Sequence, residues 1–304
     1  MSHARFQYGE NRRSLPVTFW YPTLAVENRK RLGIFDVSAA FDAAPAPGKH
    51  KLILLSHGSG GSDLNHHDWA EALAHAGYVV AAPRHIGDSR EVNRGQGGKE
   101  KLLERPRQLL AALDAVLADP RLGSHVDTRR IGVMGFSAGC HTSLVAMGAT
   151  PDYSRWPAYC HLHSDSIAIG PTQTDSELSR PAPEDWEAVR EHRIGAAVLF
   201  APFALLFDRN ALSQLTHPIR LYRAEQESIA RNEVNADALA EGLARRPEVI
   251  TVPGGHYVFI APVAADVAQK YPEYYVDAPG IDRYAIHAGI ADEIVNFFGR
   301  TLQG

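Results

Sequence analysis

The chain has 304 residues, with 31 Lys and Arg against 35 Asp and Glu, which gives a formal net charge of −4 with neutral His. Hydrophobic residues make up 45% and charged residues 22%, as in ordinary globular domains, so the composition argues against a disordered, collagen-like or coiled-coil chain. A chain of this length buries roughly 75% of the surface that it exposes when unfolded. We therefore expect one domain over residues 1–304, with a core that needs no disulfide.

Charge and hydropathy also limit the partners. There is no run rich in Lys and Arg, so we expect no nucleic-acid partner. The longest stretch without a charged residue, 131–151, is interrupted by Ser137, His141 and four glycines, so we expect no membrane partner. The first ten residues lack the apolar core of a secretory signal, which favours a cytoplasmic location, although a removed signal would leave the same start. Cys140 and Cys160 match no zinc spacing and are expected to be free thiols.

Apolar runs and helical periodicities alternate along the chain, which predicts a mostly parallel central sheet with helices on both faces. Residues 22–50 resemble a loop. Residues 149–194 break the alternation and predict a lid or cap excursion before the strand at residues 196–201. The strands are predicted at residues 15–21, 51–56, 78–82, 131–136, 196–201, 219–222 and 249–252, and the helices at residues 68–76, 99–118, 137–147, 183–191 and 284–302.

A Gly-Phe-Ser-Ala-Gly segment spans residues 135–139 and falls between a predicted buried strand and a predicted helix. In that context the glycines permit a tight turn that exposes the serine hydroxyl above the sheet. Small-residue packing of the helix would explain the glycines but not a serine at the apex. We predict that Ser137 is a nucleophile.

A serine hydroxyl needs a base, and the base needs a group that orients it. His256 follows the last predicted strand in a Gly-Gly-His turn, so it is the predicted base. The acid is open among three carboxylates: Glu227 is preferred because the loop after its strand has turned toward His256, followed by Glu225 and Asp208. The order serine, acid, histidine is that of an α/β-hydrolase.

Charge that develops on a substrate oxygen needs fixed donors. The predicted donors of the oxyanion hole are the backbone N–H groups of Ala138, directly after the nucleophile, and Ser59, in the His-Gly-Ser-Gly-Gly loop over residues 57–61. That loop has no following Lys-Ser or Lys-Thr, so a phosphate-binding loop is disfavoured.

These segments together resemble the α/β-hydrolase branch of bacterial predicted dienelactone hydrolases and platelet-activating-factor acetylhydrolase-like serine esterases. The elbow within residues 130–139, the Arg-Ala-Glu-Gln-Glu run over 223–227, the Gly-Gly-His-Tyr-Val-Phe-Ile run over 254–260 and the segment 15–22 carry the resemblance, which covers most of the chain. It implies hydrolysis of small or short-chain esters without metal or cofactor. It places the acid at Glu227, where relatives more often carry Asp.

Two further groups of side chains have two interpretations each. His161, His163 and Asp165 have a spacing that could bind metal, but no fourth ligand is evident, and we expect no metal. The aromatic residues in and after the excursion either line an acyl pocket or form a small core of their own; they are Trp156, Tyr159, Trp186, Phe203 and Phe207.

The sequence thus predicts a carboxylic ester hydrolase that forms an acyl-enzyme on a small-molecule ester substrate, with Ser137, His256 and Glu227 as its triad. Three alternatives stay open. One is an amidase, peptidase or acyltransferase with the same triad. The second is a non-catalytic ligand-binding protein on the same fold, and the third is metal-dependent hydrolysis through His161 and His163. The sequence does not fix the oligomeric state or the acyl length.

Overall fold

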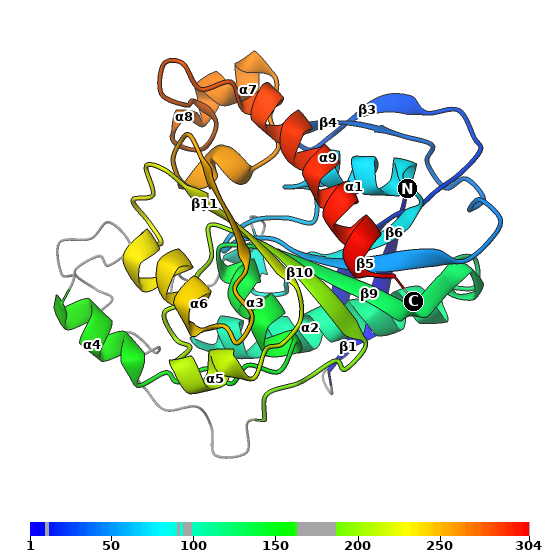
Figure 1. Cartoon of the computed structure of the whole chain (residues 1–304). Helices are drawn as coiled ribbons and strands as arrows, with labels where there is room; N and C mark the ends of the chain where they lie inside the picture. The colour runs from blue at the N-terminus through cyan, green and yellow to red at the C-terminus, as the bar shows by residue number, and fades with distance from the viewer. Residues whose placement is uncertain (10–11, 90–91, 94–98, 163–186, 304) are drawn as a thin grey trace.

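The computed structural model describes residues 1–9, 12–89, 92–93, 99–162 and 187–303 (Figure 1). In this part of the chain, eight strands form one sheet in the order β1-β2-β6-β5-β9-β10-β11-β12. The strands from β6 to β12 run parallel, and β1 and β2 are antiparallel additions at one edge. The mostly parallel sheet predicted from the sequence is confirmed. The strands are β1 (Ser2–Tyr8), β2 (Arg13–Trp20), β5 (His50–Ser56), β6 (Tyr78–Pro83), β9 (Val126–Phe136), β10 (Ile194–Phe200), β11 (Ile219–Ala224) and β12 (Glu248–Val252).

Helices cover both faces of this sheet, as Figure 1 shows. On one face α1 (His67–His75) packs with α9 (Arg283–Thr301), and on the other α2 (Lys99–Ala118) packs with α3 (Ala138–Ala146). The shorter elements complete the chain: β3 (Asn28–Leu32), β4 (Phe35–Ala39), β7 (Asp88–Ser89), β8 (Val92–Asn93), α4 (Arg155–Leu162), α5 (Arg209–Ser213), α6 (Ala236–Gly242), α7 (Ala265–Lys270) and α8 (Pro272–Tyr275), with short 3₁₀ turns at η1 (Gly123–His125), η3 (Asn232–Val234) and η4 (His256–Phe259).

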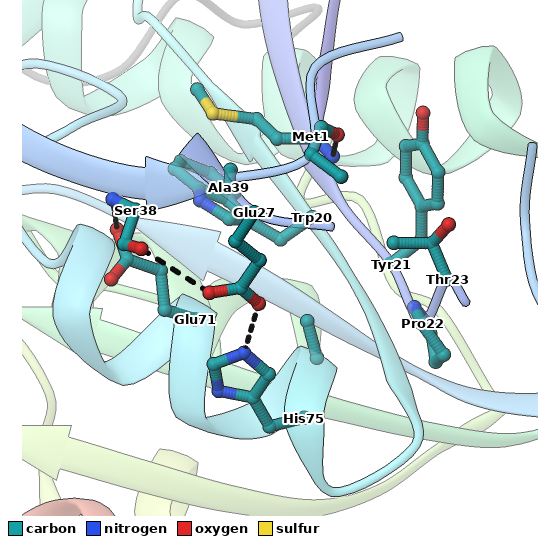
Figure 2. A pocket seen from close by; sticks show the side chains of 12 residues that line it. Met1, Trp20, Tyr21, Pro22, Thr23, Glu27, Ser38, Ala39, Glu71 and His75 are labelled. Carbon is teal, nitrogen blue, oxygen red and sulfur yellow. Dashed lines mark hydrogen bonds and ion pairs between the residues drawn. The ribbon is translucent and has the colours of Figure 1, made fainter. Parts of the chain in front are cut away.

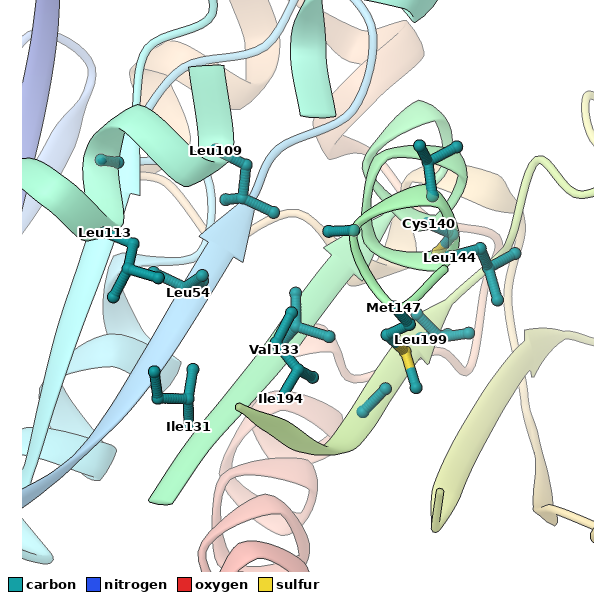
Figure 3. Packing of buried hydrophobic residues seen from close by; sticks show 14 of the residues in the cluster. Leu54, Leu109, Leu113, Ile131, Val133, Cys140, Leu144, Met147, Ile194 and Leu199 are labelled. Carbon is teal, nitrogen blue, oxygen red and sulfur yellow. The ribbon is translucent and has the colours of Figure 1, made fainter. Parts of the chain in front are cut away.

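The core lies between the central strands and the helices that cover them. Figure 3 shows Leu113 of α2 and Leu144 of α3 packed over Leu54, Val133 and Leu199 of β5, β9 and β10. All five side chains are almost fully buried, and each such burial contributes about 1.5–3 kcal/mol. These three strands, which carry the candidate site at their ends, are therefore held rigidly.

Most predicted elements are present within a few residues, and the long helix over 99–118 has the predicted bounds. Two predictions are wrong. Residues 22–50 contain the antiparallel hairpin of β3 and β4; alternate residues of β4 are buried, whereas β3 is exposed and has no apolar pattern. Residues 187–191, the described end of the helix predicted at 183–191, are not helical.

The excursion predicted at 149–194 is described only in part. It contains α4, while residues 163–186 lie outside the described residues. The lid and the single-domain boundaries stay predictions. No described helix is both long and apolar enough to cross a membrane.

Candidate functional site

The predicted nucleophile lies at a sharp turn between β9 and α3. Ser137 has φ 51° and ψ −117°, a conformation that an L-residue adopts only when its surroundings impose it. Two neighbouring glycines make the crossing possible. A Cβ on Gly135 would lie 2.4 Å from the carbonyl oxygen of Gly139, and one on Gly139 would lie 2.0 Å from that of Ser56. The two glycines of the Gly-x-Ser-x-Gly pattern are thus a steric requirement of this turn.

Backbone hydrogen bonds fix the strained turn. The N–H of Ser137 donates to the carbonyl of Phe200 at 2.9 Å, and its own carbonyl accepts from the N–H of Phe203 at 3.1 Å. The Ser137 side chain is partly exposed and its hydroxyl makes no hydrogen bond to a described residue, His256 included. In unliganded sites, catalytic hydrogen bonds often form only with substrate bound. The hydroxyl is therefore accessible at the end of a rigid strand.

The predicted base and acid meet in a buried pair. His256 begins η4, and its Nδ1 lies 2.8 Å from Oε2 of Glu227. The side chains are 3% and 1% exposed. The ring of His256 lies 5.0 Å from that of Phe136, the residue before Ser137. An imidazole held by a buried carboxylate thus lies beside the serine turn.

The other Glu227 oxygen, Oε1, accepts from the backbone N–H groups of Ile229 and Ala230 at 2.9 and 3.0 Å. Burial opposes ionisation of this carboxyl, but the hydrogen bond and charge of His256, with these two N–H groups, hold the pKa of Glu227 below its ordinary value. The carboxylate is therefore ionised near neutral pH and its orientation is fixed at both oxygens.

The two competing carboxylates are engaged elsewhere. Glu225 is exposed and accepts a hydrogen bond from Gln226 at 2.9 Å. Asp208 caps α5, where its Oδ1 accepts from the N–H of Ala211 at 2.7 Å. Of the three candidate acids, Glu227 is the one that hydrogen-bonds to His256.

The two predicted oxyanion donors flank the serine turn. Ala138 is the first residue of α3, where backbone N–H groups have no intrahelical acceptor. Ser59 lies in the loop after β5. A Cβ built on its neighbour Gly58 would lie 3.5 Å from Cβ of Ser137 and 2.7 Å from the Phe136 ring, so the loop packs directly against the turn. Within the described ranges, neither the Ser59 nor the Ala138 N–H donates a hydrogen bond to another residue.

The predicted aromatic residues divide into two groups. Trp156 and Tyr159 of α4 form a small buried cluster that includes Ala138, with Phe203 packed against it. Phe207 belongs instead to the main core, and Trp186 lies outside the described residues. Part of the aromatic set therefore lies next to the predicted oxyanion donor.

The remaining cysteine and histidine predictions are tested only in part. Cys140 is a free, buried thiol in α3, and burial raises its pKa well above the usual range. The side chains of Cys160 and His161 lie outside the described part of the structure, as do residues His163 and Asp165. Among the side chains that are described, no group of three or more His, Cys, Asp or Glu could hold a metal ion.

A separate pocket lies between β2, β4 and α1 (Figure 2), lined in part by Trp20, Glu27, Ser38, Glu71 and His75. Its polar groups bind one another: Glu27 pairs with His75 and accepts from the Ser38 hydroxyl, and Glu71 accepts from the Ser38 N–H. No residue of the Ser137 site lines it.

Sequence reasoning did not identify two charged residues below the Ser59 loop, Asp88 and Arg105. Arg105 had a signal in the sequence, because it lies between Leu102 and Leu109 on the apolar side of the predicted helix over 99–118. Both side chains are 1% exposed and form an ion pair. Asp88 had no comparable signal.

Comparison with known proteins agrees with this fold. The model of the Dienelactone hydrolase family matches residues 37–160, and no curated protein matches the sequence. A ferulic acid esterase from Streptomyces cinnamoneus is 20% identical, with 99% of this chain and 89% of that chain covered at a TM-score of 0.67. Thermogutta terrifontis esterase 2 is 16% identical, with 99% and 97% covered at a TM-score of 0.56.

A cold-adapted esterase from an Arctic intertidal metagenomic library is 15% identical over 99% of this chain and 93% of that chain, at a TM-score of 0.53. These three likenesses concern the fold, which is that of the α/β-hydrolases. With this fold, the match over residues 37–160 to the dienelactone hydrolase family indicates a carboxylic ester hydrolase.

Proposed function

We propose that this chain is a serine esterase that cleaves small or short-chain carboxylic esters through an acyl-enzyme. The observation that carries the proposal is the buried hydrogen bond between Glu227 and His256, next to a serine in a strained turn at the end of β9. A carboxylate in this position orients the imidazole and stabilises its protonated form.

In the proposed reaction, Ser137 Oγ attacks the ester carbonyl while His256 Nε2 takes its proton. The oxyanion receives hydrogen bonds from the Ser59 and Ala138 N–H groups. The alkoxide leaving group departs with the proton from His256, which leaves the acyl group on Ser137. Water, deprotonated by His256, then attacks the acyl-enzyme and releases the acid.

Two kinds of observation bear on which acyl group the ester substrate carries. Structures of Thermogutta terrifontis esterase 2 have been solved with butyrate and with propionate bound, which favours short acyl chains here. The aromatic cluster around Trp156 and Ala138 favours an aryl acyl group as a second candidate, and the likeness to a ferulic acid esterase agrees with it. The substrate is a small molecule in both cases.

The test combines covalent labelling with hydrolysis. A fluorophosphonate probe should add once to the wild type, on the peptide that contains Ser137, and should not label Ser137→Ala. Wild-type protein should hydrolyse p-nitrophenyl acetate, p-nitrophenyl butyrate or methyl ferulate, and the Ala variant should lose this activity while its thermal unfolding stays cooperative. Labelling of another residue would refute the nucleophile. Faster cleavage of a matched anilide would favour an amidase.

A further inference from the structure

A buried ion pair lies beneath the Ser59 loop. Asp88 in β7 and Arg105 in α2 are 1% exposed, and Arg105 Nη1 donates to Asp88 Oδ2 at 2.5 Å. Lys101 Nζ lies 3.6 Å from the other Asp88 oxygen. Buried ion pairs add little net stability compared with apolar side chains of the same volume. The hydrogen bonds of such a pair, however, fix the positions of the groups that they join, and those of Asp88 and Arg105 join segments of the candidate active site.

Arg105 joins the end of β5 to the first turn of α3. Its Nη2 donates to the carbonyl of His57, and its Nε donates to the Thr142 hydroxyl at 3.1 Å. Thr142 in turn donates to the carbonyl of Ala138 at 3.0 Å. The planar guanidinium thus sets the separation between the loop that carries Ser59 and the helix that carries Ala138.

Asp88 holds the same loop from its other end. Its Oδ1 accepts from the Ser59 hydroxyl at 2.8 Å and from the Gly60 N–H at 2.9 Å. Burial raises the pKa of this carboxyl, but the charge of Arg105 and the Gly60 N–H outweigh it and bring the pKa to about 2. The ion pair of Asp88 and Arg105, which we call the clamp, is therefore charged under all ordinary assay conditions.

The middle of the loop is fixed by His57. The N–H of His85 donates to His57 Nε2 at 3.1 Å, so the proton resides on Nδ1, which donates to the Gly58 carbonyl at 2.7 Å. Burial and the charge of Arg105 lower the pKa of His57 to about 4, and the ring stays neutral.

Three consecutive peptide groups are thereby oriented. Arg105 holds the carbonyl of His57, His57 holds that of Gly58, and Asp88 holds the N–H of Gly60. Since the N–H of a trans peptide points away from its carbonyl, the bond to the Gly58 carbonyl directs the Ser59 N–H in the opposite direction. In the described structure that N–H has no acceptor and remains available to a substrate.

We propose that Asp88 and Arg105 are positioning residues, which aim the Ser59 and Ala138 N–H groups at the oxyanion that forms during ester cleavage. The inference rests on the proposed function. A positioning role acts on the transition state, so it predicts a loss in kcat rather than a rise in KM.

The test compares Arg105→Lys with Arg220→Lys. Lysine keeps the charge at 105 but not the fork that reaches Asp88, His57 and Thr142. Arg220 is a matched control, since its side chain is 12% exposed. Its hydrogen bonds go to Tyr222, Glu248 and Glu293, and none of them reaches the Ser59 loop or α3.

With p-nitrophenyl butyrate, Arg105→Lys should lower kcat by about 10- to 100-fold, a fraction of what losing an oxyanion donor costs. KM should change less than threefold. The affinity for a trifluoromethyl ketone, whose adduct with serine carries the same oxyanion, should fall in parallel with kcat. Arg220→Lys should stay within twofold of wild type in all three quantities.

A second variant covers the case in which Arg105→Lys does not unfold cooperatively. Ser59→Ala deletes one hydrogen bond to Asp88 at an exposed residue and should lower kcat by about three- to tenfold. If every folded variant matches Arg220→Lys, or if KM rises while kcat holds, the clamp does not position the donors and the inference is overturned. An inactive wild type, or an active Ser137→Ala, would instead overturn the proposed function.

Discussion

The replacement Glu227→Gln tests the most specific part of the proposed triad. Gln keeps the size of Glu, and its carbonyl oxygen can still accept from the N–H groups of Ile229 and Ala230, which now bond to Oε1. The amide NH₂ then occupies the position of Oε2, 2.8 Å from Nδ1 of His256. An amide donor at this place requires Nδ1 to accept, so the proton moves to Nε2.

A histidine protonated at Nε2 cannot take the serine proton. The corresponding change in a serine triad lowers kcat by about 10⁴-fold, which is about 5.5 kcal/mol of transition-state stabilisation. We expect kcat for p-nitrophenyl butyrate to fall by about 10³- to 10⁴-fold in Glu227→Gln, with KM changed less than threefold. The rate of fluorophosphonate labelling of Ser137 should fall with it.

Two control variants separate this effect from a general loss of charge. Glu225→Gln alters an exposed side chain and should retain activity within twofold. Asp208→Asn preserves a cap of α5, since Asn also caps helices, and should also retain activity. The assignment of the acid is refuted if Glu227→Gln keeps more than a tenth of wild-type kcat, or if either control shows the large loss instead.

Three further variants test the serine turn and the buried residues near it. Burial lowers the pKa of His57 to about 4 and that of His141 to about 3. In the unfolded chain each histidine binds a proton below about pH 6.5. Between that pH and about pH 4, each should therefore lower the free energy of unfolding by about 1.4 kcal/mol for every pH unit that the pH falls. In His141→Phe, the free energy of unfolding measured in urea should depend less on pH between pH 6 and 4.5, by about that amount per pH unit. An unchanged pH dependence would contradict a lowered pKa of His141. Gly58→Ala places a carbon 2.7 Å from the Phe136 ring, so it should destabilise by about 1–3 kcal/mol in urea and lower kcat at least tenfold; wild-type values would show that the loop has room. Ser137→Gly should be about 1 kcal/mol more stable than Ser137→Ala in urea, because glycine relieves φ 51°, and equal stabilities would argue against strain.

The sequence could suggest this candidate triad because each of its members follows a predicted strand. Ser137 and Glu227 come after largely buried strands and His256 comes after the more exposed β12; parallel strands bring their carboxyl ends to one edge of the sheet. The choice of Glu227 over Glu225 was less direct. It depends on which way the loop after β11 turns, and the hydrogen bonds of Glu227 to Ile229 and Ala230 that fix this turn are not readable from residue types.

The parts that sequence reasoning missed depend on tertiary contacts. Asp88 lies in a two-residue strand between segments with no apolar period, and its partner Arg105 is 17 residues away in α2. The strand Asn28–Leu32 consists largely of charged residues and is defined by its pairing with Phe35–Ala39. In both cases the local sequence pattern is weak, and the structure of the segment depends on a tertiary contact that this pattern does not predict.

Two of the four described non-glycine residues with positive φ lie at the same edge of the sheet as the chemistry. Ser137 directly follows β9 with φ 51°, and Ala201 directly follows the neighbouring β10 with φ 40°. The two are tied together, since the Ser137 N–H donates to the carbonyl of Phe200 and the Ala201 N–H donates to that of Tyr222. Each non-glycine residue with a positive φ of this kind lowers the stability of the folded state by about 1–3 kcal/mol. The buried strands beneath them supply the stability that offsets this cost, so the strain is best explained by the placement of the serine hydroxyl between His256 and the Ser59 loop.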